Sequence, residues 1–376
     1  MKPEKCVVLS DSFKGSLTSR EIGELVTEEM ARFFPSCRVE AIPAADGGEG
    51  TAECLAGVCG GNTVKVNSIT GPVGEKIRAG YVVLPDGTAV VEMAAAAGLP
   101  LAEGREDPGR ATTFGVGQLM VHALEHGAKR IVLGLGGSAT NDCGTGCAAA
   151  LGAEFFNSRG EAFIPTGNTL EEIVHMDLRA LKSRLEGVEI TAICDVTNPM
   201  HGPEGAAFVY APQKGADPAE VELLDRNLKA MDRLFQRELG LSVAEVPGAG
   251  AAGAFGAGVL ALLGGRLKRG IDTILDLIGF EELISDADLV ITGEGRLDSQ
   301  SFCGKVVGTV GQRAQRLGIP VYALVGQVDE EGLRAAQSGG ITAVYPITPA
   351  GEPIAQARLH SRDYYRSALD KMLEKI

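Results

Sequence analysis

The segment spanning residues 289–305 constrains the fold more than any other part of the chain. It begins with the apolar and β-branched run 289–292, which is typical of a strand buried on both faces of a parallel sheet. The run then breaks into glycines among which stand four charged residues, Glu294, Arg296, Asp298 and Lys305. Ligands of open α/β sheets bind beyond the carboxyl ends of the strands, so these side chains are candidates for a functional site. A solvated turn closed by a salt bridge is the competing interpretation.

Similar apolar runs, separated by helical patterns, occur at both ends of the chain. The five predicted strands cover residues 6–10, 38–43, 289–292, 321–325 and 342–346. This alternation predicts an α/β fold with a flavodoxin-like, five-stranded parallel sheet in the order 2-1-3-4-5. In that order the first and third strands are neighbours. We therefore expect the loop 11–16 to face the segment 293–298 in one crevice.

The middle of the chain has a different texture and predicts a second domain. Strand-like segments occur at 63–66, 79–84, 89–93, 130–133 and 188–194, with a hairpin turn at 85–88 and an amphipathic helix at 218–239. A chain of 376 residues exceeds what one core usually supports. We predict a discontinuous flavodoxin-like domain, 1–60 plus 276–376, and an inserted mixed α/β domain, 61–275.

The composition of the chain disfavours some classes of binding partner. The formal charge of −14 opposes binding to nucleic acid or to an anionic membrane surface. No segment has the pattern of a signal peptide or of a membrane-spanning helix. None of the eight cysteines forms a CxxC pair, and most lie in apolar patterns. These features predict a cytoplasmic protein that binds small molecules and is a monomer or a homodimer.

Several other loops have the chemistry of ligand sites. The segment 44–51 carries Asp46 and Glu49 among glycines, although their spacing also fits a helix capping box. The segment 134–142 predicts a strand, a glycine turn and a helix start that offers N–H donors and hydroxyls to an anion. The sequence GxGxxG at 248–253 is a weak dinucleotide signal, because the residues before it make a poor strand. We interpret it as the start of a closely packed helix.

Long motifs occur along nearly the whole chain: DSFKGS from Asp11, PAADGGEGT from Pro43, ITGP from Ile69, VEMAAAAGL from Val91, ATTFGVG from Ala111, GLGGSATND from Gly134, CDVTNP from Cys194, APQKGA from Ala211, GAGAAG from Gly248 and TGEGRLDSQS from Thr292. Through these motifs, in this order, the chain resembles the type I, bacterial glycerate 2-kinase family over nearly its whole length. Cys143, Cys147 and the pair 254–255 depart from the residues usual in that family, and these departures bear on helix packing. The resemblance implies two α/β domains with the active site between them, ATP and Mg²⁺ as cosubstrates, and D-glycerate as acceptor.

Phosphoryl transfer needs positioning, neutralisation of phosphate charge and a carboxylate that orients or deprotonates the attacking hydroxyl. We expect Lys14, Arg296 and Lys305 to neutralise phosphates or the glycerate carboxylate. The base and the metal ligand are sought among Asp298, Asp195, Asp46 and Glu49. Spacing does not assign these roles; we favour Asp298 as base and Asp195 as Mg²⁺ ligand, with Glu49 as a second ligand.

The remaining predicted contacts fall into two sets. The acceptor is expected to contact Asp11, Ser12, Asp46, Gly47, Gly48, Glu49 and Arg296. The nucleotide phosphates are expected to contact Gly136, Gly137, Ser138, Thr140, Asn141, Lys214, Gly293 and Gly295.

Three alternatives stay open at this point. Phosphate is expected on the 2-hydroxyl by family resemblance alone, so a kinase acting on the 3-hydroxyl or on another small sugar acid is the nearest alternative. A nicotinamide-dependent oxidoreductase would use the GxGxxG segment. A non-catalytic sugar-acid sensor would bind its ligand without turnover, but no helix-turn-helix pattern supports a regulator of transcription.

Overall fold

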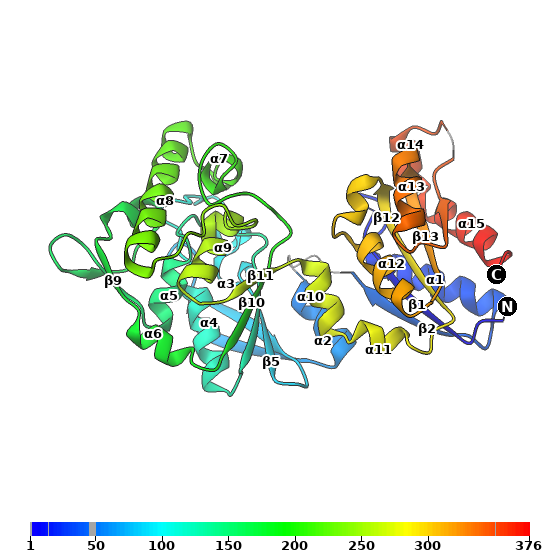
Figure 1. Cartoon of the computed structure of the whole chain (residues 1–376), viewed down its shortest axis with the longest axis horizontal. Helices are drawn as coiled ribbons and strands as arrows, with labels where there is room; N and C mark the ends of the chain where they lie inside the picture. Colours follow the sequence, from blue (N-terminus) through cyan, green and yellow to red (C-terminus); the bar gives the residue numbers. More distant parts are fainter. Residues whose placement is uncertain (1, 14, 45–49, 350) are drawn as a thin grey trace. The chain divides into compact units, whose positions relative to one another are not determined.

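The computed structural model describes residues 2–13, 15–44, 50–349 and 351–376. The chain divides into two compact units. Unit 1 comprises Met1–Ala45 and Ile271–Ile376, and unit 2 comprises Asp46–Gly270. Each unit has its own sheet and its own helices (Figure 1). Unit 1 is therefore built from both ends of the chain.

The sheet of unit 1 confirms the predicted flavodoxin-like order. Its strands are β1 (Lys5–Ser10), β2 (Arg38–Pro43), β12 (Leu289–Leu297), β13 (Val321–Val328) and β14 (Ala343–Pro346). They pair in parallel in the order β14-β13-β12-β1-β2. Numbered along the unit, this is the order 2-1-3-4-5. The carboxyl ends of β1 and β12 consequently lie side by side.

One prediction about β12 is wrong. The sequence pattern ends this strand at Thr292 and begins a glycine turn, whereas β12 continues to Leu297 and stays paired with β13. The glycines permit the pairing, because a Cβ at Gly293 would overlap the carbonyl oxygen of Leu324 and a Cβ at Gly326 would overlap that of Gly295. These glycines let two backbones approach closely, and they do not turn the chain.

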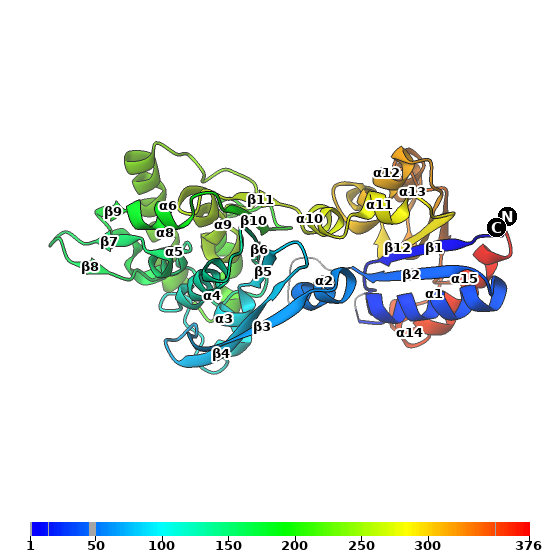
Figure 2. The same cartoon turned by 90° about the horizontal axis from the view of Figure 1, so that it is seen from below.

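Helices cover both faces of the unit 1 sheet. Figure 2 shows α1 (Ser19–Phe33) and α15 (Ser361–Leu373) on one side and α12 (Val306–Arg316) on the other. Thr18 caps the start of α1 and forms a capping box with Glu21. The other helical segments are α10 (Gly270–Leu277), α11 (Phe280–Ile284), η4 (Ser299–Phe302), α13 (Glu330–Ser338) and α14 (Ile354–Leu359).

Unit 2 is built on a mixed six-stranded sheet in the order β11-β10-β6-β5-β4-β3. Its strands are β3 (Asn62–Thr70), β4 (Lys76–Val83), β5 (Thr88–Glu92), β6 (Arg130–Gly134), β10 (Glu189–Ile193) and β11 (Arg266–Lys268). The segment β3 to β5 is antiparallel, and the rest is parallel. A separate three-stranded sheet contains β7 (Glu154–Phe156), β8 (Ala162–Phe163) and β9 (His175–Asp177).

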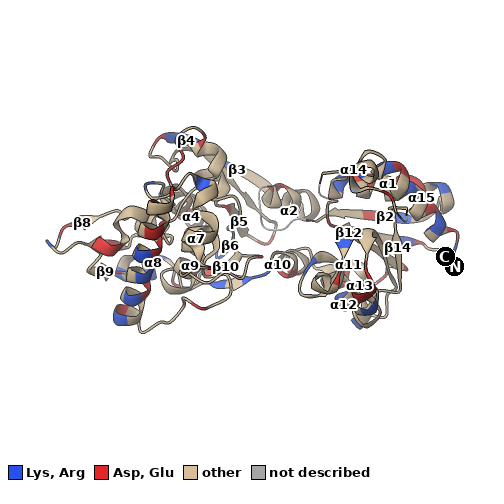
Figure 3. Cartoon of the chain, turned by 90° about the horizontal axis from the view of Figure 1, so that it is seen from above, with Lys and Arg blue, Asp and Glu red and all other residues tan. Residues whose placement is uncertain are grey.

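The helices of unit 2 enclose its larger core. They are α2 (Thr51–Cys59), α3 (Ala94–Ala97), α4 (Phe114–Glu125), α5 (Thr145–Leu151), α6 (Arg179–Arg184), α7 (Ala206–Tyr210), α8 (Pro218–Leu239) and α9 (Ala251–Ala261), with short 3₁₀ turns η1 (Leu99–Ala102), η2 (Gly167–Glu172) and η3 (Pro212–Lys214). The bounds of α8 match the predicted helix. Its outer face mixes Lys and Arg with Asp and Glu (Figure 3), as expected for a solvated surface.

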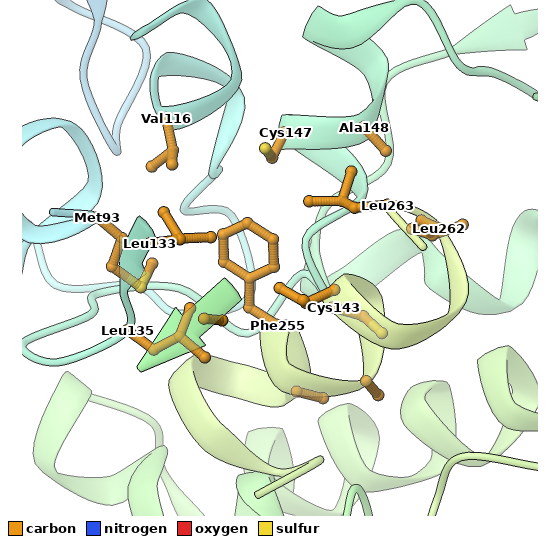
Figure 4. Packing of buried hydrophobic residues seen from close by; sticks show 14 of the residues in the cluster. Met93, Val116, Leu133, Leu135, Cys143, Cys147, Ala148, Phe255, Leu262 and Leu263 are labelled. Atoms are coloured by element: carbon orange, nitrogen blue, oxygen red, sulfur yellow. The ribbon is translucent and has the colours of Figure 1, made fainter. Parts of the chain in front are cut away.

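The residues that depart from the family pattern meet in the core of unit 2. Cys143, Cys147 and Phe255 are fully buried in one cluster. Figure 4 shows the Phe255 ring among Leu133, Cys147 and the other labelled apolar side chains. Gly144 leaves room for the ring, because a Cβ there would overlap it. The larger aromatic is thus accommodated by packing, as the sequence predicts for these positions.

The GxGxxG segment packs against neighbouring backbone. A Cβ at Gly250 would overlap the carbonyl oxygen of Pro199, and one at Gly253 would overlap that of Thr140. Ala252 and Ala254 have φ values of 55° and 65°, so the helix is kinked at its start. These glycines bring α9 close to two loops, which agrees with the interpretation as a closely packed helix.

Candidate active site

Unit 1 has a cavity of about 500 Å³ at the carboxyl ends of its strands, which we call the β12 cavity. It is lined by Asp11, Ser12, Phe13, Ser16, Glu294, Gly295, Arg296, Lys305, Gly326, Gln327, Ile347, Thr348, Ala357, Arg358 and Ser361. The backbone N–H of Asp11 donates to the carbonyl oxygen of Gly293 at 2.9 Å. The loop after β1 and the end of β12 therefore meet, as the strand order predicts.

Within the part of the chain that the structure describes, three cations line the β12 cavity. The side chain of Arg296 is 67% exposed, with Nη2 at 3.7 Å from Oδ2 of Asp329. Lys305 stands just before α12, with Nζ at 4.0 Å from Oε2 of Glu294 and 3.9 Å from Oδ1 of Asp298. Arg358 comes from α14 and is absent from the predicted set. Together these side chains offer positive charge to a small anionic ligand.

Glu294 is the buried acid of the β12 cavity. The residue is only 5% exposed, and its Oε1 has no hydrogen-bond partner among the described residues. Burial raises the pKa of its carboxyl to about 7; Asp11 and Asp298 also raise it, whereas the Ser301 hydroxyl and Lys305 lower it. A carboxyl with these properties exchanges a proton near neutral pH. Sequence reasoning counted Glu294 among the four charged candidates of its motif but assigned no role to it.

Asp298 has a structural role, because it caps the short helix η4. Its Oδ1 accepts hydrogen bonds from the backbone N–H groups of Gln300 at 3.0 Å and Ser301 at 3.2 Å. The Ser301 hydroxyl in turn accepts from the Asp298 N–H, which completes a capping box for η4. Asp298 does not line the β12 cavity. The D-S-Q-S spacing is the sequence signal that could have indicated this capping role.

Unit 2 has its own cavity of about 440 Å³, which we call the Lys214 cavity. Its lining includes Gly136, Gly137 and Ser138 after β6, Cys194, Asp195 and Val196 after β10, and Tyr210, Gln213 and Lys214 from α7 and η3. Lys214 is 3% exposed, and its Nζ donates to Oγ of Ser138 at 2.7 Å and to the carbonyl oxygen of Thr140 at 2.8 Å. Burial lowers the pKa of Lys214 to about 7, partly countered by Asp142.

A buried carboxylate holds the loop after β6 in shape. Asp142 accepts hydrogen bonds from the backbone N–H groups of Thr113, Gly144 and Gly146 and from the Thr113 hydroxyl. The predicted helix start in this segment is wrong, because α5 begins only at Thr145. A loop stands where the helix was predicted to begin, because the Asp142 carboxylate accepts hydrogen bonds from these N–H and O–H groups. Its residues Gly136 to Ser138 instead line the Lys214 cavity.

The other predicted phosphate contacts differ in position. Thr140 and Asn141 are buried and are absent from the lining of the Lys214 cavity. The Thr140 hydroxyl and both polar atoms of the Asn141 amide lack hydrogen-bond partners within the described part of the chain. Of the two predicted glycines on β12, Gly295 lines the β12 cavity, whereas Gly293 packs against β13.

Asp195 is the predicted metal ligand that the structure places in a cavity. Its Oδ1 accepts a hydrogen bond from the backbone N–H of Gly270 at 2.8 Å. No group of three or more His, Cys, Asp or Glu side chains converges as a metal site within the described ranges. The second predicted ligand, Glu49, lies outside the described residues, as do Lys14, Asp46, Gly47 and Gly48.

Comparisons with known proteins agree over the whole chain. The model of the glycerate kinase family matches residues 6–376. The glycerate kinase of Bacillus cereus (strain ATCC 10987 / NRS 248) is 43% identical over 355 residues, which cover 94% of this chain and 93% of that protein. The glycerate 2-kinase of Escherichia coli (strain K12) is 40% identical over 345 residues, covering 91% of this chain and 90% of the relative.

A solved structure is similar as well. A Salmonella typhimurium LT2 protein provisionally named glycerate kinase 2 superposes with a TM-score of 0.83 at 37% identity, covering 99% of this chain and 97% of that one. None of the helices in the described ranges has the length and apolar character needed to cross a membrane. With a family model and relatives matched along nearly its entire length, the chain belongs to the glycerate kinase family, whose members are enzymes that phosphorylate glycerate.

Proposed function

We propose that this chain transfers the γ-phosphate of ATP to the 2-hydroxyl of D-glycerate and releases 2-phospho-D-glycerate and ADP. The observation that carries the proposal is the membership of the glycerate kinase family along residues 6–376. The name of the Escherichia coli relative, glycerate 2-kinase, favours the 2-hydroxyl. The two cavities, each with charged side chains in its lining, offer separate sites for the two substrates.

The Lys214 cavity is the proposed site of the nucleotide phosphates. Gly136 and Gly137 line the cavity without a side chain to cover their backbone, and Ser138 adds a hydroxyl. Phosphates bound beside Lys214 would favour its charged form, because an anion near the ammonium offsets the cost of burial. This residue would then neutralise part of the charge that develops on the transferred group.

The β12 cavity is the proposed site of D-glycerate. Arg296 offers a planar guanidinium, the group best suited to a bidentate contact with the acceptor's carboxylate. Lys305 and Arg358 supply further positive charge at the same cavity. Asp11 and Ser12 also belong to its lining. The Asp11 carboxylate would accept hydrogen bonds from hydroxyl groups of the acceptor, and the Ser12 hydroxyl would donate or accept them.

Magnesium fits the donor set at the Lys214 cavity. Protein sites for Mg²⁺ commonly supply one or two carboxylates, while substrate phosphates and water complete the octahedron. Asp195 provides such a carboxylate in the cavity lining, so the lack of a three-ligand cluster among the described residues does not oppose the assignment. We propose that Asp195 holds Mg²⁺ together with the nucleotide phosphates. The ion would screen phosphate charge when bound.

Phosphoryl transfer requires little covalent participation by the protein. The cations of each cavity would bind the substrate proposed for it, and a carboxylate in the β12 cavity would orient or deprotonate the attacking hydroxyl. Asp298 is the base that the sequence favours, and Glu294 is a buried acid in the cavity lining, which also contains Asp11. Reaction between the two units, a cytoplasmic location and a monomeric or homodimeric state stay predictions.

Incubation with ATP, Mg²⁺ and D-glycerate tests the proposal directly. Phosphorus NMR of the product distinguishes phosphate on the 2-hydroxyl from phosphate on the 3-hydroxyl. We expect ADP and 2-phospho-D-glycerate in equal amounts. A product phosphorylated on the 3-hydroxyl would correct the regiochemistry. Absence of turnover with glycerate, but turnover with another small sugar acid, would replace the acceptor.

A further inference from the structure

We infer that Glu294, and not Asp298, is the catalytic base that accepts the proton of the attacking hydroxyl. The inference rests on the proposed function, because it names the group that activates the glycerate hydroxyl. Both carboxylates stand near the end of β12, only four positions apart, and both are near the Lys305 ammonium. Their surroundings differ in three respects that separate a base from a structural acid.

The first difference is position. Glu294 lines the β12 cavity together with the cations proposed to bind the acceptor, whereas Asp298 is absent from that lining. Its partner in the parallel register is Val325 on β13, so a rigid central strand carries it. Catalytic groups on such elements are held more accurately than groups on loops. Any ligand that fills the cavity therefore meets Glu294.

The second difference is hydrogen bonding. Oδ1 of Asp298 already accepts two backbone N–H groups at the start of η4, which is a fixed structural role. By contrast, Oε1 of Glu294 is buried without a hydrogen-bond partner among the described residues. A buried polar atom without a partner is uncommon in a folded protein and often marks a site that a ligand completes. Glu294 is thus the carboxylate with capacity left for a substrate.

The third difference is charge. Among the described groups that act on Glu294, Asp11 and Asp298 disfavour its ionised form, and Lys305 and the Ser301 hydroxyl favour it. Desolvation outweighs them and places its pKa at about 7. A general base works best when its pKa lies near the working pH.

The atoms and electrons of the proposed step balance between the two substrates and one side chain. The hydroxyl oxygen of glycerate forms a bond to the γ-phosphorus of ATP while the bond from that phosphorus to the β–γ bridging oxygen breaks. The electron pair of the broken bond leaves on ADP. The hydroxyl proton passes to the ionised carboxylate of Glu294 and later returns to solvent. No oxidant, reductant or further reactant is needed.

The test compares four matched carboxylate variants of the full chain in a steady-state assay of ADP release. They are Glu294→Gln, Glu294→Asp, Asp298→Asn and Glu330→Gln; the last lies at an exposed position of α13 and is the control. For the wild type, kcat/KM should rise with pH and level off, with a midpoint near the pKa of about 7. In Glu294→Gln we expect kcat to fall about 10²- to 10⁴-fold, the usual contribution of a general base.

The pH profile distinguishes catalysis from structure. In Glu294→Gln the fall of kcat/KM at low pH, which we call the acidic limb, should disappear. Its KM for glycerate should stay within a few-fold of the wild type. Glu294→Asp should recover part of the rate and keep a limb. Asp298→Asn should keep the limb even where weaker capping lowers the melting temperature. Each variant's thermal unfolding and circular dichroism show that it is folded.

Three results would overturn the inference. Near-normal kcat in Glu294→Gln would show that this carboxylate is dispensable. Loss of the acidic limb in Asp298→Asn, with the limb kept in Glu294→Gln, would assign the base to Asp298. A Glu294→Gln protein that does not fold, together with a Glu294→Asp protein that folds and lacks the limb, would also exclude the role. Wild type that does not phosphorylate glycerate would instead refute the proposed function.

Discussion

Replacement of Lys214 by methionine should change how the stability of the protein depends on pH. Lys214 is 3% exposed in unit 2, and its ammonium is desolvated by the surrounding protein. Methionine has a similar length and no charge, so Lys214→Met removes a group that resists protonation in the folded state. The same substitution removes hydrogen bonds to Ser138 and Thr140, which is a constant loss across the pH range.

The size of the effect follows from proton linkage. The pKa of Lys214 is about 7 in the folded chain and 10.5 for an ordinary lysine. Between these values the unfolded chain binds more protons, so the unfolding free energy of the wild type rises with pH across this window and falls as pH is lowered. Relative to Lys214→Met, the wild type should gain about 2.5 kcal/mol between about pH 7.5 and about pH 9.5.

Urea unfolding of the nucleotide-free proteins, followed by circular dichroism at both pH values, measures this difference. Other titrating groups cancel when the variant is subtracted from the wild type. Lys182→Met, at an exposed position of α6, is the matched control and should change in parallel with the wild type. If Lys214→Met also changes in parallel with the wild type, the folded lysine is charged and the reasoning fails.

Further predictions concern the backbone, the acceptor and the metal. Gly293→Ala should lower the unfolding free energy by about 1–3 kcal/mol, because its Cβ would overlap the Leu324 carbonyl oxygen. Gly57→Ala, with open space around its Cβ, should not lower the unfolding free energy and is the control. Urea unfolding compares the two variants. Arg296→Ala should raise the KM for D-glycerate roughly 10- to 100-fold with a smaller change in kcat, as expected for loss of a charge-assisted contact. Arg316→Ala is the kinetic control, and an equal KM in both variants would contradict the acceptor site. Chelation of Mg²⁺ should abolish ADP release, and added Mg²⁺ should restore it.

Strand order was predictable because it depends on patterns that a sequence displays. Five apolar runs alternating with helical patterns led to the order 2-1-3-4-5, and the pairing of β1 with β12 confirms it. From that order followed the meeting of the Asp11 loop with Gly293. These inferences need only the period of the hydrophobic residues and the handedness of βαβ units.

The character of individual side chains was less predictable because it depends on partners distant in sequence. Gly293 reads as a turn residue, and only the carbonyl of Leu324 on the next strand explains why it is a glycine inside a strand. Glu294 and Asp298 look equivalent in the motif. Burial of one and capping by the other distinguish them, and burial depends on the elements that pack around β12.

The discontinuous course of unit 1 has a consequence during protein synthesis. Lys5 donates its backbone N–H to Asp288, a residue 283 positions later. At roughly 5–20 residues per second, about 15 to 60 s separate the emergence of these two partners from the ribosome. Through that interval one edge of β1 lacks its neighbour β12, and all of unit 2 is synthesised before β12 emerges. A nascent chain therefore exposes an apolar strand edge for most of its synthesis, which is where we expect a holding chaperone to bind.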